Sequence, residues 1–196
     1  MSKELRNIEA IPTKVGGTTY RSRTEARWAV LFTEMGVRFD YEPEYIELSS
    51  GERYLPDFYL HDFNAYLEVK PDNTEVITAE CRKARVLGQE LKDQRRSVWL
   101  ALGPPSEEFA NIIILSEWNL EDDIEVILGS YVNRYQIQED RRDEKVYWLL
   151  CEDEVGEGFR RAYMVGGPGD STDHDRLPMI IRTVKRAYDL ASKPFG

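Results

Sequence analysis

Two extended segments with a short turn between them constrain the fold of this chain more than any other feature. Residues 54–60 and 65–70 are each predicted to form a β-strand, and both contain aromatic side chains, which are common in strands. With a turn centred between Asp62 and Phe63, the two segments pair residue by residue as an antiparallel hairpin. The hairpin then sets which side chains share each face of a sheet.

Helices are predicted before and after this hairpin. Ser22 and Glu25 fit a capping box, and the good helix formers of residues 26–35 end at Gly36, a usual C-terminal cap. A second helix with one apolar stripe is predicted over residues 75–94. The hairpin is therefore enclosed by two amphipathic helices along the chain.

Further strands complete a mixed sheet. An extended segment is predicted over residues 37–48 and a short apolar strand over 98–102. Residues 111–115 are hydrophobic almost throughout, as in strands that are buried on both faces. The resulting order is helix, three strands, helix, two strands. This order predicts an α/β fold in which helices flank a mixed central sheet.

The C-terminal part is predicted in less detail. Strands are expected at 147–151 and 160–165, an exposed loop at 166–176, and a last helix that begins at Pro178. A chain of 196 residues suffices for one domain with a buried core. We divide it into a lead-in of residues 1–19, a core of residues 20–116, and a C-terminal extension of strands and a helix, residues 117–196, packed on that core.

Composition excludes several classes of protein. The chain has 26 Lys and Arg residues and 36 Asp and Glu residues, which gives a net charge of −10. This charge argues against a protein that coats nucleic acid by bulk charge, but it is compatible with a small basic surface for nucleic acid. Two cysteines and two histidines are too few for a disulfide framework or a four-ligand zinc site, and favour a reducing, cytoplasmic setting. There is no apolar run of about 18 residues and no secretory signal core in residues 1–17, so we expect no membrane partner.

Acidic side chains converge on one face of the predicted hairpin. Asp57 faces Glu68 directly, and Glu68 shares its face with Lys70 because strand side chains alternate. Like charges across a strand pair destabilise it, and a bound divalent cation is the simplest compensation. Magnesium suits such a site because it takes few carboxylates and keeps several waters. Glu25, on the inward side of the first helix, is placed to complete the shell.

Each of these residues also has a simpler interpretation. Glu25 alone fits a capping-box residue, and Asp57 alone fits a strand entry. Glu68 and Lys70 alone fit a solvated strand face. Their predicted convergence on one patch favours the interpretation as a metal site.

This pattern resembles the signature of the PD-(D/E)XK nuclease superfamily. The string PD at 56–57, ten intervening residues and the string EVK at 68–70 match that signature. The helix that carries Glu25 is similar to the first helix of that fold, and the predicted order over residues 20–116 is similar to its restriction-endonuclease-like αβββαβ core. More narrowly, the first helix, the hairpin and the last helix resemble uncharacterised nucleases of bacteriophages and actinobacteria.

The resemblance implies a deoxyribonuclease that uses Mg²⁺ or Mn²⁺. It implies hydrolysis of phosphodiester bonds in DNA by in-line attack of a metal-activated water. Asp57 and Glu68 would be the metal ligands, with the backbone carbonyl of Val69 as a further ligand. Glu25 would be an auxiliary ligand or a water-orienting acid, and Lys70 the catalytic lysine.

Contacts to DNA are expected from basic and polar side chains near this site. A helix N-terminus attracts anions, which favours Arg21, Arg23 and Arg27 as phosphate contacts, with ordinary surface arginine as the alternative. The resemblance adds a polar residue on the second helix. Lys83 and Gln89 are both candidates for that position.

Other functions stay open on the sequence. The same fold can serve as a catalytically silent module that binds nucleic acid or protein, which the net charge of −10 keeps in view; cleavage of RNA is a weaker third hypothesis. The intact acidic pair and lysine count against a silent module. Residues 120–175 have no counterpart in the family, so the C-terminal extension is open to three roles: a homodimer interface, a surface for a protein partner, and a target-recognition element.

Overall fold

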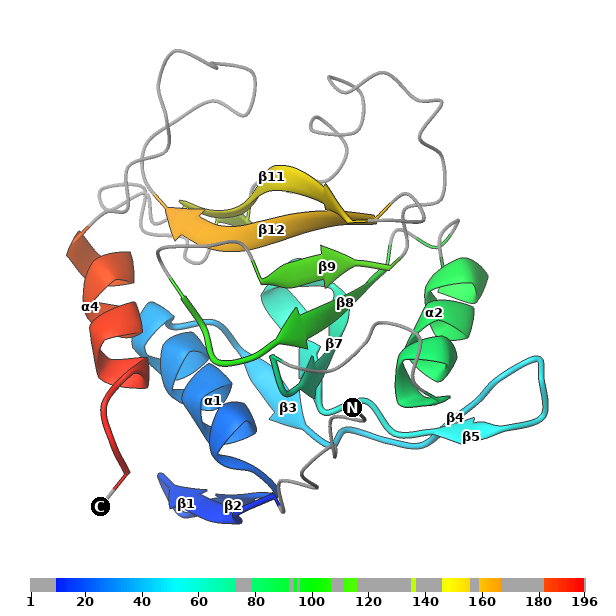
Figure 1. Ribbon diagram of the computed structural model, residues 1–196, viewed down its shortest axis with the longest axis horizontal. Coiled ribbons are helices and arrows are strands. Elements are labelled where there is room, and N and C mark those ends of the chain that lie inside the picture. The colour runs from blue at the N-terminus through cyan, green and yellow to red at the C-terminus, as the bar shows by residue number, and fades with distance from the viewer. Residues whose placement is uncertain are drawn as a thin grey trace, which may run out of the picture.

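The structure is a computed structural model that describes residues 10–72, 79–91, 94, 96–106, 111–115, 135–136, 146–155, 159–166 and 182–195. Its elements in chain order are β1 (Thr13–Val15), β2 (Thr18–Tyr20), α1 (Arg23–Met35), β3 (Phe39–Tyr41), β4 (Ile46–Glu47), β5 (Arg53–Tyr54), β6 (Phe58–Leu60), the 3₁₀ turn η1 (His61–Phe63), β7 (Ala65–Lys70), α2 (Ala79–Leu91), β8 (Ser97–Leu102), β9 (Ile112–Ile114), β10 (Tyr135–Gln136), β11 (Val146–Val155), β12 (Phe159–Gly166) and α4 (Arg182–Ala191). Helices pack on both faces of a central sheet (Figure 1).

One mixed sheet organises the described part of the chain. Its eight strands lie in the order β10-β11-β12-β9-β8-β7-β6-β3. The neighbours β7 and β8 are parallel, and every other neighbouring pair among the described strands is antiparallel. Parallel neighbours need a crossover, and α2 lies in the connection between them. The predicted α/β fold with a mixed sheet flanked by helices is confirmed at this level.

The two faces of the sheet bury separate apolar clusters. α1 and α4 cover one face, where Trp28, Phe58 and Tyr188 belong to one cluster. α2 covers the other face, where Leu87 and Leu100 belong to the second. With both faces covered, β9 is buried throughout, as its apolar pattern predicts, and β8 is buried except at its two ends.

The register of the hairpin agrees with the sequence prediction. β6 pairs with β7 through Phe58 opposite Leu67 and Tyr59 opposite Tyr66. The turn between them is the 3₁₀ turn η1, which ends at Asn64 in the left-handed conformation, φ 47°. Asparagine tolerates that conformation because its short side chain hydrogen-bonds locally.

The extended segments predicted on either side of residue 50 are each divided in the structure. The segment at 37–48 becomes β3 and β4, with a break at Glu42 (φ 48°) and Pro43. The segment at 54–60 becomes the end of β5 and β6, with the break at Pro56, since proline cannot donate to a ladder. β4 and β5 pair only with each other and extend from the body beside α2 (Figure 1). The prediction of two continuous strands was therefore wrong.

The later elements lie where they were predicted, within the described residues. α2 falls inside the predicted helix at 75–94, and β11 and β12 contain the strands predicted at 147–151 and 160–165. α4 buries Val184 and other positions of the predicted apolar face. The predicted start of that helix at residue 178 lies outside the described residues, as does almost all of the loop at 166–176; the division of the chain at residue 116 stays a prediction. None of the described helices is long and apolar enough to cross a membrane.

Gly103 joins the ends of the two parallel strands to α1. Its N–H donates to the carbonyl of Lys70 at 2.7 Å, and its own carbonyl accepts from Nε1 of Trp28 at 3.0 Å. Its φ of 80° is in the left-handed region, and a Cβ built there would lie 2.9 Å from Cβ of Asp72. The position therefore excludes any side chain for two independent reasons.

We expect Gly103→Ala to lower the free energy of unfolding by about 2–4 kcal/mol, because backbone strain and overpacking add. Gly51→Ala is the matched control, since Gly51 also has φ 80° but nothing lies within 4 Å of its built Cβ. Strain alone predicts a loss of about 1 kcal/mol there. Denaturant unfolding measures both variants, and equal losses would contradict the close approach at Gly103.

Candidate functional site

The predicted catalytic and metal-binding residues meet in one cleft at the end of β7. The cleft has a volume of about 330 Å³ and is lined from the start of α1, the β5–β6 connection, the end of β7 and the start of α2. Arg53, Tyr54 and Glu80 line it together with the predicted residues Arg21, Glu25, Asp57, Glu68, Val69, Lys70 and Lys83.

Glu25 is both a helix cap and a buried acid. Oγ of Ser22 accepts from the Glu25 N–H at 3.1 Å and donates to its Oε1 at 2.7 Å, so the predicted cap at the start of α1 is confirmed. Its Oε2 accepts from the Tyr41 hydroxyl at 2.6 Å and from the Arg21 N–H at 3.2 Å. With only 7% of the residue exposed, these contacts hold the carboxylate against the cleft wall.

Asp57 lies where the chain enters β6 and is buried, with 5% of its surface exposed. Oδ2 accepts from the backbone N–H of Val69 at 2.7 Å, which ties this entry to the end of β7. Oδ1 lies 3.5 Å from the guanidinium of Arg21. Burial, and then the nearby charges of Glu68 and Glu25, raise the pKa of the Asp57 carboxyl well above its usual value.

Glu68 is held from two sides on β7. Its Oε2 accepts from the Tyr54 hydroxyl at 2.7 Å, and its Oε1 lies 2.5 Å from Nζ of Lys70. Burial is the largest single effect on Lys70 and opposes its charge, but the charge and hydrogen bond of Glu68, with the charges of Asp57 and Glu80, together raise the pKa of the ammonium. Burial and then the charge of Glu68 raise the pKa of the Tyr54 hydroxyl well above its usual value. Tyr54 therefore acts as a donor and Lys70 as a cation at neutral pH.

The cleft suits a hard cation that keeps much of its water. Among the described residues, no group of three acidic, histidine or cysteine side chains is arranged to hold a metal ion. The buried pair Asp57 and Glu68 nonetheless presents carboxylate oxygens beside the backbone of Val69. Mg²⁺ binds through one or two carboxylates with several waters, so this smaller donor set fits its chemistry. A cation would also offset the mutual repulsion of the buried acids.

The predicted DNA-contact residues differ in their placement. Arg21 reaches into the cleft and pairs with Glu42 at 2.5 Å, so its charge is largely used within the protein. Arg23 is exposed and lines an adjoining pocket of about 430 Å³ that shares residues of the cleft. Arg27 is half-buried on α1. The nucleic-acid contacts themselves stay predictions.

Of the two candidates on α2, Lys83 lines the cleft. Its Nζ lies 3.7 Å from a carboxylate oxygen of Glu52. Gln89 is exposed almost two turns further along the helix. The position that the resemblance assigns to a polar residue of the second helix is therefore better matched by Lys83.

Sequence reasoning missed the two tyrosines that hold the buried acids. Tyr54 lies beyond the break at Pro56, so strand alternation counted from Asp57 gives no information about its direction. Tyr41 contacts Glu25 across two different elements, which no local pattern reports. Tyr54 is buried and Tyr41 partly buried, which alone suggests packing, and only the folded geometry shows each hydroxyl at a carboxylate.

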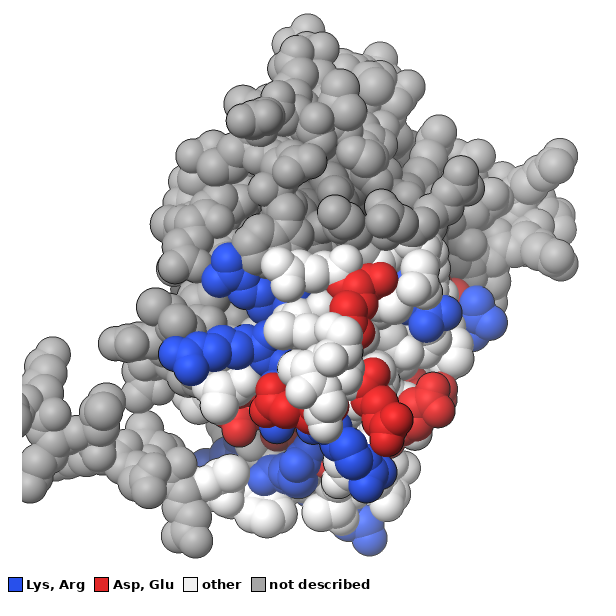
Figure 2. Space-filling view, turned by 90° about the vertical axis from the view of Figure 1, so that its right-hand side faces the viewer, with Lys and Arg blue, Asp and Glu red and all other residues white. Residues whose placement is uncertain are grey.

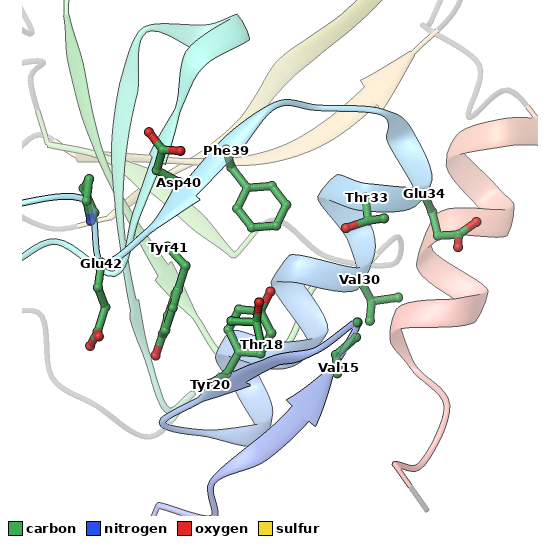
Figure 3. Close-up of a pocket in the computed structure, with 12 residues that line it drawn as sticks. Val15, Thr18, Tyr20, Val30, Thr33, Glu34, Phe39, Asp40, Tyr41 and Glu42 are labelled. Carbon is green, nitrogen blue, oxygen red and sulfur yellow. The ribbon is translucent and has the colours of Figure 1, made fainter.

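A larger cavity lies elsewhere and has different chemistry. It measures about 750 Å³ and lies among β1, β2, α1 and β3. Figure 3 shows aromatic and apolar side chains between Glu34 of α1 on one side and Asp40 and Glu42 of the β3 segment on the other. Glu42 pairs with a guanidinium and Asp40 with an imidazole, and no lysine is among the residues that line the cavity. We therefore take the smaller cleft, where buried acids and a lysine converge, as the functional site.

The raised pKa of Asp57 predicts an unusual pH dependence of stability. The folded state binds more protons than the unfolded chain at pH values between the ordinary carboxyl pKa, about 4, and the raised one, so stability falls as pH rises through that window. Asp57→Asn removes this term and keeps an oxygen to accept from Val69. In EDTA we expect this variant to melt above the wild type at pH 8, with the difference shrinking toward pH 4.

Thermal melts at several pH values measure this, with Asp189→Asn at an exposed position of α4 as the control. Parallel curves for wild type and Asp57→Asn would contradict the assigned environment of the carboxyl.

Comparisons with known proteins place no further constraint on this cleft. No family model, no curated protein and no solved structure matches the chain. The chemistry of the site is therefore argued from its own residues.

Proposed function

We propose that this protein is a metal-dependent nuclease of the PD-(D/E)XK type that hydrolyses phosphodiester bonds in DNA. One observation carries the proposal: two buried carboxylates, Asp57 and Glu68, share a cleft with a protonated lysine and with a third carboxylate. A core has no structural need for such a group, because burying like charges costs stability. A functional role best explains why this protein keeps a group of charges that lowers its stability.

The order of the elements supports the same proposal. α1 is followed by the antiparallel strands β3, β6 and β7, then by α2, then by β8 parallel to β7. This is the order that the αβββαβ resemblance implies, with the β4–β5 hairpin added between the first two strands. The acidic residues lie on the elements that the resemblance assigns to them.

Asp57 and Glu68 would hold Mg²⁺ or Mn²⁺, with the carbonyl of Val69 beside them. When bound, such an ion lowers the pKa of a coordinated water and polarises a phosphoryl oxygen. The Val69 N–H holds Asp57 and the Tyr54 hydroxyl holds Glu68, so each carboxylate is oriented before any ligand arrives.

Lys70 and Glu25 complete the catalytic group. The ammonium of Lys70 faces the cleft and stays charged, so it can orient an attacking water and stabilise negative charge that builds on the phosphate. Glu25 is fixed by the side chains of Ser22 and Tyr41 and can orient a water as an auxiliary acid. Hydrolysis by in-line attack of water requires no covalent intermediate on the protein.

Cleavage of supercoiled plasmid, linear duplex and single-stranded DNA tests the proposal directly. We expect cutting with Mg²⁺ or Mn²⁺, none in EDTA, and losses of about 100- to 1000-fold in Asp57→Ala and Lys70→Ala. Asp189→Ala and Lys193→Ala remove the same charges from exposed positions at the end of α4 and should cut like the wild type.

The outcomes separate the alternatives. Cutting that survives in both cleft variants would place the chemistry elsewhere. No cutting by the wild type, with no metal bound in calorimetry, would leave the catalytically silent binding module as the better description. Preferential cutting of RNA in the same assay would change the substrate class and keep the site.

The Tyr54 hydroxyl should matter through Glu68. We expect Tyr54→Phe to raise the metal concentration for half-maximal cleavage about 10-fold, because outer partners of metal ligands contribute at that level. Tyr188→Phe is the matched control, since Tyr188 also loses a buried hydrogen bond, to the Met164 carbonyl at 2.8 Å, but away from the cleft. Metal titrations of cleavage measure both, and an equal shift in both would reduce Tyr54 to a structural role.

A further inference from the structure

The β4–β5 hairpin is anchored on α2 and lines one side of the cleft. The backbone N–H of Ser49 donates to Oε1 of Glu90 at 2.8 Å, and Glu52 pairs with Lys83 at 3.7 Å. Leu48 is buried in the cluster under α2. The hairpin therefore holds its position although, among the described strands, it pairs with none of the main sheet.

An exposed aromatic residue, Tyr45, directly precedes β4 of this hairpin. Tyr45 is 59% exposed, and only Ile11 among the other large hydrophobic residues of the described chain is exposed as well. The guanidinium of Arg53 lies over the Tyr45 ring, 4.4 Å from its centroid. Arg53 therefore covers one face of the ring, while more than half of the surface of Tyr45 stays open to solvent.

Strand β5, which carries Arg53, links the Tyr45 ring to the catalytic group. Arg53 lines the cleft, and the next residue, Tyr54, donates to Glu68. A strand of nucleic acid with a phosphate in the cleft would therefore pass Arg53 before it reaches Tyr45.

Charge on this side of the molecule does not favour a duplex held by its phosphates. Figure 2 views the side of α2 and the β4–β5 hairpin and shows basic and acidic side chains beside one another. Glu42 pairs with Arg21, Glu52 with Lys83, and Glu47 lies opposite Arg53 in the strand register. Since these cations have acidic neighbours, affinity here must come from stacking, which depends little on net charge.

We propose that Tyr45, backed by Arg53, is a stacking subsite for an unpaired base of the strand that enters the cleft. The proposal rests on the proposed function and deepens it: the substrate class is DNA that is single-stranded beside the cleavage position. Every base presents a π-face, so the subsite selects unpaired structure and not sequence.

Fluorescence anisotropy of labelled oligonucleotides of about 12 nucleotides, single-stranded or duplex, tests the subsite with the full chain in EDTA. We expect the wild type to bind the single strand more tightly. Tyr45→Ala should weaken single-strand binding about 10-fold and leave duplex binding unchanged, whereas Tyr45→Phe keeps the ring and should stay within about twofold. Arg53→Ala should also weaken single-strand binding. Arg186→Ala, an exposed arginine on α4 at the other side of the molecule, should have no effect.

Three results would overturn the subsite: unchanged binding by Tyr45→Ala, an equal loss for duplex and single strand, or no binding of the single strand by the wild type. The binding assay contains no metal, so its failure is distinct from failure of the nuclease. Metal-dependent cutting without any role for Tyr45 removes the subsite alone. Tyr45-dependent binding without cutting removes the nuclease alone.

Discussion

The pairing of β6 with β7 is the interaction on which the core and the candidate site both depend. Its register places Phe58 opposite Leu67 in the cluster under α1 and brings Asp57 to the height of Glu68. A slip of one residue would turn every side chain of a strand to the other face, which would expose the core and separate the acids together. The apolar side chains packed under α1 thus maintain the geometry of the site, although none of them is a functional group of that site.

The cleft shows how buried acids can be kept in order. Each carboxylate accepts at least one short hydrogen bond: from Tyr41, from the Val69 N–H or from Tyr54. Lys70 pairs with Glu68 and Arg21 lies near Asp57, yet burial and the neighbouring acids still raise the pKa of the Asp57 carboxyl. Sites that bind a cation and a phosphate commonly keep such repulsion between carboxylates. Function requires the like charges to lie close together, and the protein loses stability as a result.

Sequence reasoning succeeded where the determinants are local or periodic. The cap of α1, the hairpin register and the convergence of Glu25, Asp57, Glu68 and Lys70 on one cleft follow from spacing, alternation and helix chemistry. It failed between Pro43 and Pro56, which each interrupt a predicted extended segment. The residues between these prolines pair as a separate hairpin that is anchored to α2, and a contact with α2 cannot be predicted from the local sequence. Contacts between elements, such as that of Tyr41 with Glu25, have no one-dimensional signature.

The β4–β5 hairpin has a consequence for how proteins of this architecture can diverge. It is inserted between β3 and β6, which stay adjacent in the sheet regardless of what the chain does between them. Its length and sequence can therefore change with little effect on strand order, while its last residue still contacts Glu68. In the nuclease that we propose, such an insertion would let the choice of substrate change independently of the chemistry, through loop exchange and not through redesign of the core.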